Sequence, residues 1–214
     1  MARRYVIRQD AAPVAPISGI DYRTALNEEQ YAAVSSEPGP ALVIAGAGSG
    51  KTRTLTYRVA WLLDHGTDPW NILLLTFTNK AAREMTERVR SLIPLDLSRL
   101  WSGTFHSIAN RILRQHAEYL GYTPAFTIMD SDDRKSMIKS VVKSLKLDEK
   151  STRFPKPEVL SSLFSLADNE GANIRETLEN AYPYLSNHLD AILEVHDQYV
   201  ARKQETNSMD FDDL

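Results

Sequence analysis

The segment Ala45–Arg53, AGAGSGKTR, combines residue types that suit the binding of a polyphosphate. Its three alternating glycines let the backbone curl tightly after a short apolar run, and a helical pattern follows at once. The first N–H groups of such a helix are unpaired and lie at the positive end of the helix dipole, so they attract anions. Lys51 is placed to reach the terminal phosphates of a nucleoside triphosphate, and the Thr52 hydroxyl to ligate Mg²⁺. The sequence therefore predicts a nucleotide-binding loop whose chemically active residues are Lys51 and Thr52.

This loop departs from the common pattern G-x-x-x-x-G-K-S/T at one position, where Ala45 replaces the first glycine. An ordinary glycine-rich connection is the alternative, and it is disfavoured because strand, loop, Lys-Thr pair and helix follow in the required order. The loop does not identify the work done with the nucleotide, because kinases, GTPases, transporters and motors share it. The predicted phosphate-side residues are Ala45, Gly46, Ala47, Gly48, Ser49, Gly50, Lys51 and Thr52.

Short apolar runs alternate with amphipathic segments over residues 41–120. Such runs are typical of buried strands, and apolar residues at helical spacing indicate helices. The predicted pairs of strand and helix are 41–45 with Lys51–Asp64, 71–77 with Asn79–Ile93, and 100–105 with Ser107–Leu120. This alternation predicts a parallel sheet covered by helices.

The sequence on either side of this region has a different character. Residues 1–24 are rich in proline and alanine without sustained periodicity, which favours an extended arm. A helix is expected from a Thr24 cap, through acidic residues in its first turn, to about Val34. From about Asp130 onward the apolar spacing is helical, so an all-helical second unit without strands is expected.

The composition is that of a globular chain, with 214 residues of which 43% are hydrophobic. A formal net charge of −3 does not indicate a polyanionic partner, so any nucleic-acid contact would use a local basic surface. The lack of cysteine excludes disulfides and thiolate metal sites and fits a reducing cytoplasm. With neither a membrane-spanning run nor a signal peptide, a cytoplasmic protein without membrane contact is expected.

Several blocks in order resemble the UvrD/Rep/PcrA group of superfamily 1 DNA helicases. LNEEQ (26–30) is similar to the family's Q motif, and AGAGSGKTRT (45–54) is similar to its Walker A motif in the form that begins with alanine. TFTNKAAREM (76–85) resembles motif Ia, and GTFHS (103–107) resembles motif Ib. MDFDDL (209–214) resembles the segment where that family's chain leaves its helical insertion. The resemblance implies an α/β fold: an incomplete RecA-like P-loop NTPase parallel sheet with helices on both faces, plus an all-helical insertion subdomain. It divides the chain into an arm (1–24), a partial ATP-binding domain (25–115), the insertion (116–207) and a return segment (208–214).

By this resemblance the nucleotide is ATP, bound with Mg²⁺. The family's glutamine that reads the adenine edge falls on Gln30, whose amide can both donate and accept hydrogen bonds. Arg53 falls where the family has an arginine near the nucleotide.

Two Thr-Phe pairs end predicted strands, where ligands collect in open parallel sheets. Phe77 and Phe105 are therefore candidates to face a groove, with packing in the core as the alternative. The resemblance makes Phe77 a platform for base stacking, which suits a translocating motor because every base has a π-face. The residues implied to lie near single-stranded DNA are Thr76, Phe77, Asn79, Thr104, Phe105 and His106.

The predicted helical unit carries two charged groups. Lysine recurs every four residues over 135–143, opposite an apolar stripe, and either DNA or solvent alone would cover that face. The acidic cluster at 210–213 has the composition of a metal site, but we interpret these acids as caps, which is their usual role at a helix start.

The resemblance implies an ATP-dependent DNA helicase that translocates 3′ to 5′ on single-stranded DNA and unwinds duplex. Its partners would be single strands and junctions of single strand with duplex. The family's acidic Mg²⁺ motif and catalytic arginines follow the DFDDL segment, so this chain alone is expected to be inactive. Two alternatives stay open, the motor part of a helicase-nuclease and a non-catalytic ATP- or DNA-binding module.

Overall fold

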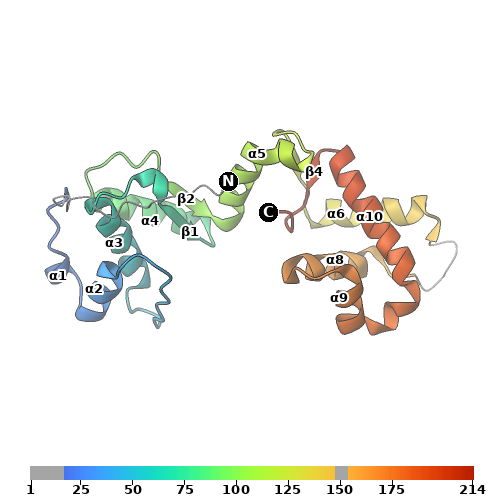
Figure 1. Cartoon of the computed structure of the whole chain (residues 1–214), viewed down its shortest axis with the longest axis horizontal. Helices are drawn as coiled ribbons and strands as arrows, with labels where there is room; N and C mark the ends of the chain where they lie inside the picture. The colour runs from blue at the N-terminus through green and yellow to red at the C-terminus, as the bar shows by residue number, and fades with distance from the viewer. Residues whose placement is uncertain (1–16, 148–153) are drawn as a thin grey trace, which may run out of the picture. The chain divides into compact units, whose positions relative to one another are not determined.

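The computed structural model describes residues 17–147 and 154–214, which form two compact units that divide between Ile108 and Ala109 (Figure 1). Most of the predicted arm, residues 1–16, lies outside the described residues. Each unit has its own hydrophobic core. Over the described ranges, every helix is too short or too polar to cross a membrane.

The first unit packs helices against a short parallel sheet. Its helices are α1 (Tyr22–Ala25), α2 (Glu28–Ser35), α3 (Lys51–Asp64), the 3-10 helix η1 (Pro69–Asn71) and α4 (Asn79–Leu92), and its strands are β1 (Leu73–Thr76) and β2 (Trp101–Thr104). The two strands run parallel, with Leu73 opposite Trp101 and Thr76 opposite Thr104. Buried apolar side chains of α3, β1 and α4 form the core of this unit.

Most of the predicted strand-helix pairs are confirmed. Strands form within 71–77 and 100–105, and α3 has the bounds that its apolar spacing predicts. Helix α4 ends one residue before the predicted Ile93. The last predicted helix begins earlier than expected and changes type, as α5 (Phe105–His116) followed by the 3-10 helix η2 (Ala117–Leu120).

The helix expected to begin at Thr24 is two helices. Asp21 caps α1 and Asn27 caps α2. The Asn27 side chain accepts the Gln30 N–H and the Gln30 side chain accepts the Asn27 N–H, a reciprocal capping box that satisfies two N–H groups at once. Leu26, between the helices, is extended and buried in the core. Thr24 is therefore not the cap, because Asn27 offers the better one.

The buried strand predicted at 41–45 is wrong. Leu42 and Ile44 are 86% and 88% exposed, and among the described residues no strand pairs with this segment. A strand needs a neighbour for its backbone N–H and C=O groups, so apolar composition alone did not make one here. The described fold is mixed α/β, mostly helical with short parallel sheets.

The second unit is mainly a helical bundle. After α5 and η2 its elements are β3 (Thr127–Ile128), α6 (Ser131–Ser144), α8 (Pro157–Glu170), α9 (Ile174–Ala181), η3 (Pro183–His188), α10 (Leu189–Glu205) and β4 (Ser208–Met209). Helices α6, α8, α9 and α10 enclose a core that includes Leu160 and Phe164 (Figure 1). Strands β3 and β4 pair in parallel, with Thr127 opposite Ser208. The all-helical insertion predicted over 116–207 is therefore wrong at β3, because a strand of two residues shows no detectable periodicity, whereas β4 lies in the predicted return segment 208–214.

Candidate nucleotide and DNA sites

The predicted phosphate loop leads into an uncapped helix start. Gly48 and Gly50 have φ angles of +77° and +86°, a left-handed backbone that other residues rarely adopt. Helix α3 begins at Lys51 without a side-chain cap, whereas Asn27 caps α2 and Thr78 caps α4. The first-turn N–H groups of α3 are therefore available to an anion.

Lys51 folds back over the loop that precedes it. Its Nζ donates to the carbonyl oxygens of Ala45, at 3.2 Å, and Gly46, at 2.7 Å. The Ser49 hydroxyl also donates to the Gly46 carbonyl, at 2.8 Å. An ammonium group held by neutral carbonyls can exchange them for charged phosphate oxygens, which make stronger hydrogen bonds. The half-buried Thr52 follows Lys51 in the first turn of α3.

Gln30 reaches the same loop from α2. Its Nε2 donates to the Ser49 carbonyl at 3.0 Å, and its Oε1 accepts the Asn27 N–H at 3.3 Å. A Cβ added to Gly50 would lie 2.7 Å from Gln30 Nε2, so glycine permits this close approach. The structure thus brings the predicted adenine reader against the predicted phosphate loop.

Arg53 is the third residue of α3 and lies in its first turn. Its Nη2 donates to the Ala25 carbonyl at 2.9 Å, and its guanidinium carbon lies 5.0 Å from the ring centroid of Tyr57. The Cβ position at Gly50 is 3.9 Å from the Arg53 Cβ. Gln30, the predicted adenine reader, and Arg53, predicted to lie near the nucleotide, therefore both lie beside Gly50.

The two Thr-Phe pairs lie side by side at the carboxyl ends of β1 and β2. Thr76 is the register partner of Thr104, and the rings of Phe77 and Phe105 have centroids 5.4 Å apart and an interplanar angle of 39°. Phe77 is 88% exposed and Phe105 is 49% exposed. Core packing, the alternative interpretation of both rings, is therefore wrong. Exposed aromatic faces at strand ends suit base stacking.

The other predicted DNA residues lie where helices begin beside these strands. Asn79 is the first residue of α4, and His106 lies in the first turn of α5; both side chains are exposed. The Thr104 hydroxyl accepts the Ser107 N–H at 3.2 Å. Polar side chains and backbone N–H groups of this kind commonly contact phosphates.

Sequence reasoning missed a hollow beside the same strand ends. Its volume is about 320 Å³. Its polar lining includes Asn79, Arg83, Thr86, Arg90, Ser102 and Ser107. Four of these side chains recur at helical spacing along α4, so the sequence did carry a signal for a shared polar face.

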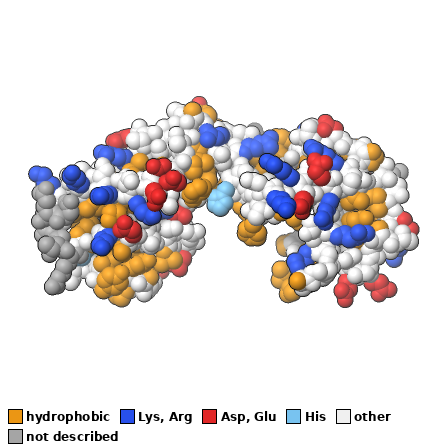
Figure 2. Space-filling view, turned by 180° about the vertical axis from the view of Figure 1, so that it is seen from behind, with side chains coloured by type: hydrophobic (Ala, Val, Ile, Leu, Met, Phe, Trp, Pro, Cys, Tyr) orange, Lys and Arg blue, Asp and Glu red, His pale blue; other side chains and the backbone are white. Residues whose placement is uncertain are grey.

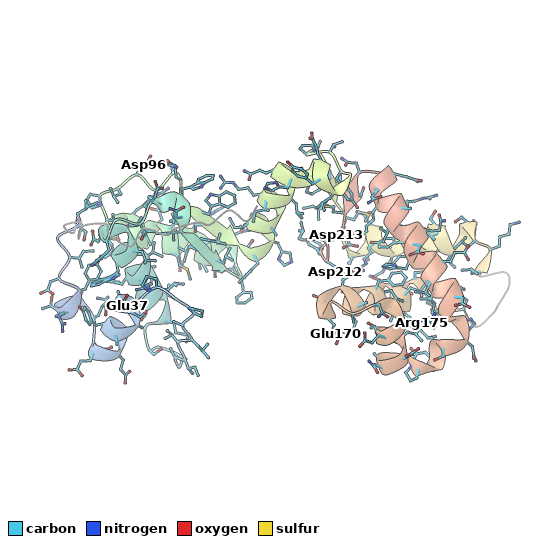
Figure 3. The ribbon with its side chains drawn as sticks, in the orientation of Figure 1. Glu37, Asp96, Glu170, Arg175, Asp212 and Asp213 are labelled. Carbon is cyan, nitrogen blue, oxygen red and sulfur yellow. The ribbon has the colours of Figure 1, made fainter. Side chains whose placement is uncertain are left out.

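The acidic segment 210–213 is neutralised by basic partners. The buried Asp210 accepts hydrogen bonds from Lys203 Nζ at 3.2 Å and from the Tyr199 hydroxyl at 2.5 Å. Asp212, which Figure 3 labels, forms an ion pair with Arg134. Burial raises the pKa of Asp210, but these neighbours outweigh that effect and hold it below its usual value. Asp210 also accepts the Asp212 N–H at 3.0 Å, a capping role in a turn. Within the described ranges, no group of three or more acidic or histidine side chains is placed to hold a metal ion.

The lysine face expected on α6 is only partly free of partners. Lys139 and Lys143 are exposed, whereas Lys135 donates to Asp132 at 3.1 Å. The opposite face buries the apolar stripe that includes Ile138. On the side of the molecule that Figure 2 shows, lysine and arginine are spread over both units rather than gathered in one patch.

Comparison with known proteins identifies the family. The sequence profile of the UvrD/REP helicase N-terminal domain matches residues 26–214, and the chain belongs to this family. A relative named ATP-dependent DNA helicase PcrA, from Staphylococcus aureus, is 42% identical over 190 residues, which cover 88% of this chain and 25% of the relative. The protein of the same name from Leuconostoc citreum is 41% identical over 194 residues, with the same shares of 88% and 25%. The chain thus spans about a quarter of the length of these relatives.

Proposed function

We propose that this chain is the ATP-binding N-terminal portion of an ATP-dependent DNA helicase that moves along single-stranded DNA and unwinds duplex. The observation that carries the proposal is the uncapped start of α3, where the glycine loop, Lys51 and Gln30 meet. The printed names of the PcrA relatives support ATP as the nucleotide and DNA as the substrate. We assign the 3′ to 5′ direction from the family resemblance.

In this proposal the triphosphate occupies the loop and the first turn of α3. The backbone N–H groups and Lys51 bind phosphate oxygens, and Gln30 exchanges its contact with the loop for the adenine edge. The Thr52 hydroxyl is a ligand of Mg²⁺, which neutralises phosphate charge when it is bound. The loop has room for a triphosphate with its Mg²⁺, because a Cβ added at Gly46 or Gly48 would meet nothing within 4 Å beyond the adjoining residues.

Single-stranded DNA is proposed to cross the carboxyl ends of β1 and β2. Phe77 and Phe105 offer stacking faces without reading sequence, while Asn79 and His106 lie where phosphates would pass. A motor needs such contacts because it must bind every base equally. Junctions of single strand with duplex are the proposed substrate on which movement becomes unwinding.

The proposal is tested first by equilibrium binding of a fluorescent ATP analogue to the chain. Lys51→Ala should weaken binding about tenfold or more, because it removes charge-assisted bonds to phosphate. Lys156→Ala, which changes an exposed lysine of the second unit, is the matched control and should bind as the wild type does. Undiminished ATP binding by Lys51→Ala would refute the nucleotide site.

Binding of labelled single-stranded DNA tests the proposed DNA contacts. Phe77→Ala should cost about 1–3 kcal/mol of binding free energy if a base stacks on this ring. Tyr119→Ala removes an aromatic side chain that is equally exposed, at 88%, but belongs to the second unit. Equal losses in the two variants would contradict a specific role for Phe77.

A further inference from the structure

Asp64 ends α3 with a fully buried carboxylate. It accepts hydrogen bonds from the Ile17 N–H at 3.1 Å, the Ser18 N–H at 2.9 Å, the Ser18 hydroxyl, and the Tyr22 hydroxyl at 2.6 Å. Burying a charged group is costly unless hydrogen bonds satisfy it, so these donors fix the segment 17–22 against the end of α3.

Tyr22 packs its ring against two aromatic side chains of α3. Its buried ring meets Trp61 edge to face at 5.0 Å and Tyr57 edge to face at 6.2 Å between centroids. Tyr22 also begins α1, the four-residue helix that ends at Ala25. Asp64 therefore acts on two features at once, the ring of Tyr57 and the position of α1.

Both of these features hold Arg53. Its guanidinium lies over the Tyr57 ring at 5.0 Å, an attractive cation–π arrangement, and its Nη2 donates to the Ala25 carbonyl at 2.9 Å. Arginine at an exposed site has several rotatable bonds, so two anchors of this kind determine where its charge lies. Helices α1, α2 and α3, blue to teal in Figure 1, are the elements that supply these groups.

We propose that Asp64, by holding the segment Ile17–Ala25 against α3, is a positioning residue that acts on the nucleotide site through Arg53. This inference rests on the proposed function. It separates two parts of ATP: the triphosphate is bound by the loop, whereas Gln30, assigned to the adenine edge, and Arg53 both lie beside Gly50. Disturbing Asp64 should therefore weaken the contribution of the adenosine part and spare that of the triphosphate.

Competition binding measures that separation, with ATP and inorganic tripolyphosphate as the two ligands of the full 214-residue chain. Asp64→Asn should weaken ATP binding about fivefold or more and leave tripolyphosphate binding unchanged. Tyr22→Phe, which keeps the ring but removes one donor to Asp64, should shift ATP binding in the same direction and carries the test if Asp64→Asn does not fold. Asp68→Asn is the matched control, because Asp68 is an exposed acid just after α3.

A second pair of variants tests the route through Tyr57. Tyr57→Leu should lose ATP affinity because it removes the ring beneath Arg53. Tyr57→Phe should keep most of the affinity, because the ring stays and only the 3.5 Å hydrogen bond from Arg53 to the Tyr57 hydroxyl is lost. If Asp64→Asn and Tyr22→Phe weaken ATP and tripolyphosphate equally, or neither, the inference is overturned while the proposed site stands. If the wild type binds neither ligand, the proposed nucleotide site fails and this inference fails with it.

Discussion

Asp64 in the first unit and Asp210 in the second are both buried carboxylates that hold a chain segment against a helix. The donors to Asp64 are backbone N–H groups and the hydroxyls of Ser18 and Tyr22, all of them uncharged. The ion is thus stabilised by dipoles that the chain itself arranges. Each of these hydrogen bonds can be removed without leaving a second charge behind.

The charge of the buried Asp210 is instead stabilised by positively charged side chains. Lys203 lies 3.2 Å away and Arg134 lies 3.7 Å away, and both cations are themselves buried. Each cation has a second acid, Asp213 for Lys203 at 2.7 Å and Asp212 for Arg134, so removing Asp210 upsets the balance of a whole group of buried charges. Two acids that are equally buried therefore need not contribute equally to stability, because loss of the acid affects neutral donors in one case and buried cations in the other.

The largest effect is expected for Asp210→Asn. We expect a loss of about 3 kcal/mol in the free energy of unfolding, because the variant removes the most deeply buried of the acids beside two buried cations. Each cation keeps its second acid, so neither loses every partner. Urea denaturation followed by circular dichroism measures this loss. Asp190→Asn, at an exposed acid of α10, should change stability by less than about 0.5 kcal/mol. A loss no greater than that of the Asp64 variant would break the comparison.

Asp64→Asn should cost less, about 1–3 kcal/mol of unfolding free energy. Its neutral donors lose a strong acceptor, but no buried charge is stranded. The same denaturation measurement applies, with Asp68→Asn as the control. That control should be close to neutral, because asparagine caps η1 as well as aspartate does.

Acidification should reduce the contribution of both acids. Burial raises the pKa of Asp64, but the bonds from Ser18 and Tyr22 outweigh it, so the pKa is lowered in the folded state. A carboxyl of this kind contributes its full stability above its unfolded pKa of about 3.9 and loses it as the pH falls through the folded value. The stability gap between wild type and Asp64→Asn should therefore shrink below about pH 4. A gap that is constant from pH 7 to pH 3 would argue against a stabilised carboxylate.

The smallest effects come from a matched pair of tyrosines. The Tyr22 hydroxyl donates to Asp64 at 2.6 Å and the Tyr199 hydroxyl donates to Asp210 at 2.5 Å. Each replacement by phenylalanine should cost about 1 kcal/mol of unfolding free energy. Tyr22→Phe should cost more, because Asp210 keeps its two cations. The reverse order in thermal denaturation would show that ion pairs do not substitute for the lost hydroxyl.

The glycine turn before α3 could be predicted because its residues are contiguous. The glycines, the lysine and the threonine all lie within residues 46–52, and the helix that begins at Lys51 has the predicted bounds. Gln30 and Arg53 were assigned from the family resemblance, and the structure brings both to Gly50. Their present partners, the carbonyls of Ser49 and Ala25, could not be predicted, because they depend on how α1 and α2 pack on α3.

Exposure was harder to predict than secondary structure. The apolar run 41–45 reads as a buried strand, yet it is unpaired and exposed in the described chain. Phe77 and Phe105 fit a core equally well by composition, yet both face outward. An apolar side chain shows that burial would be favourable, but only the neighbouring elements provide the surface that buries it.

The sequence by itself determined the loop, the bounds of α3, the two strands beside the DNA candidates and the family. These features depend on capping, periodicity and turn formation, which act over a few residues. Tertiary structure alone decided that Asp64 binds Ser18 and Tyr22, which precede it by 46 and 42 residues, and that Asp210 binds Lys203 and Arg134. A buried charge must be satisfied by whatever donors the fold brings to it, and that choice is made only when distant segments pack together.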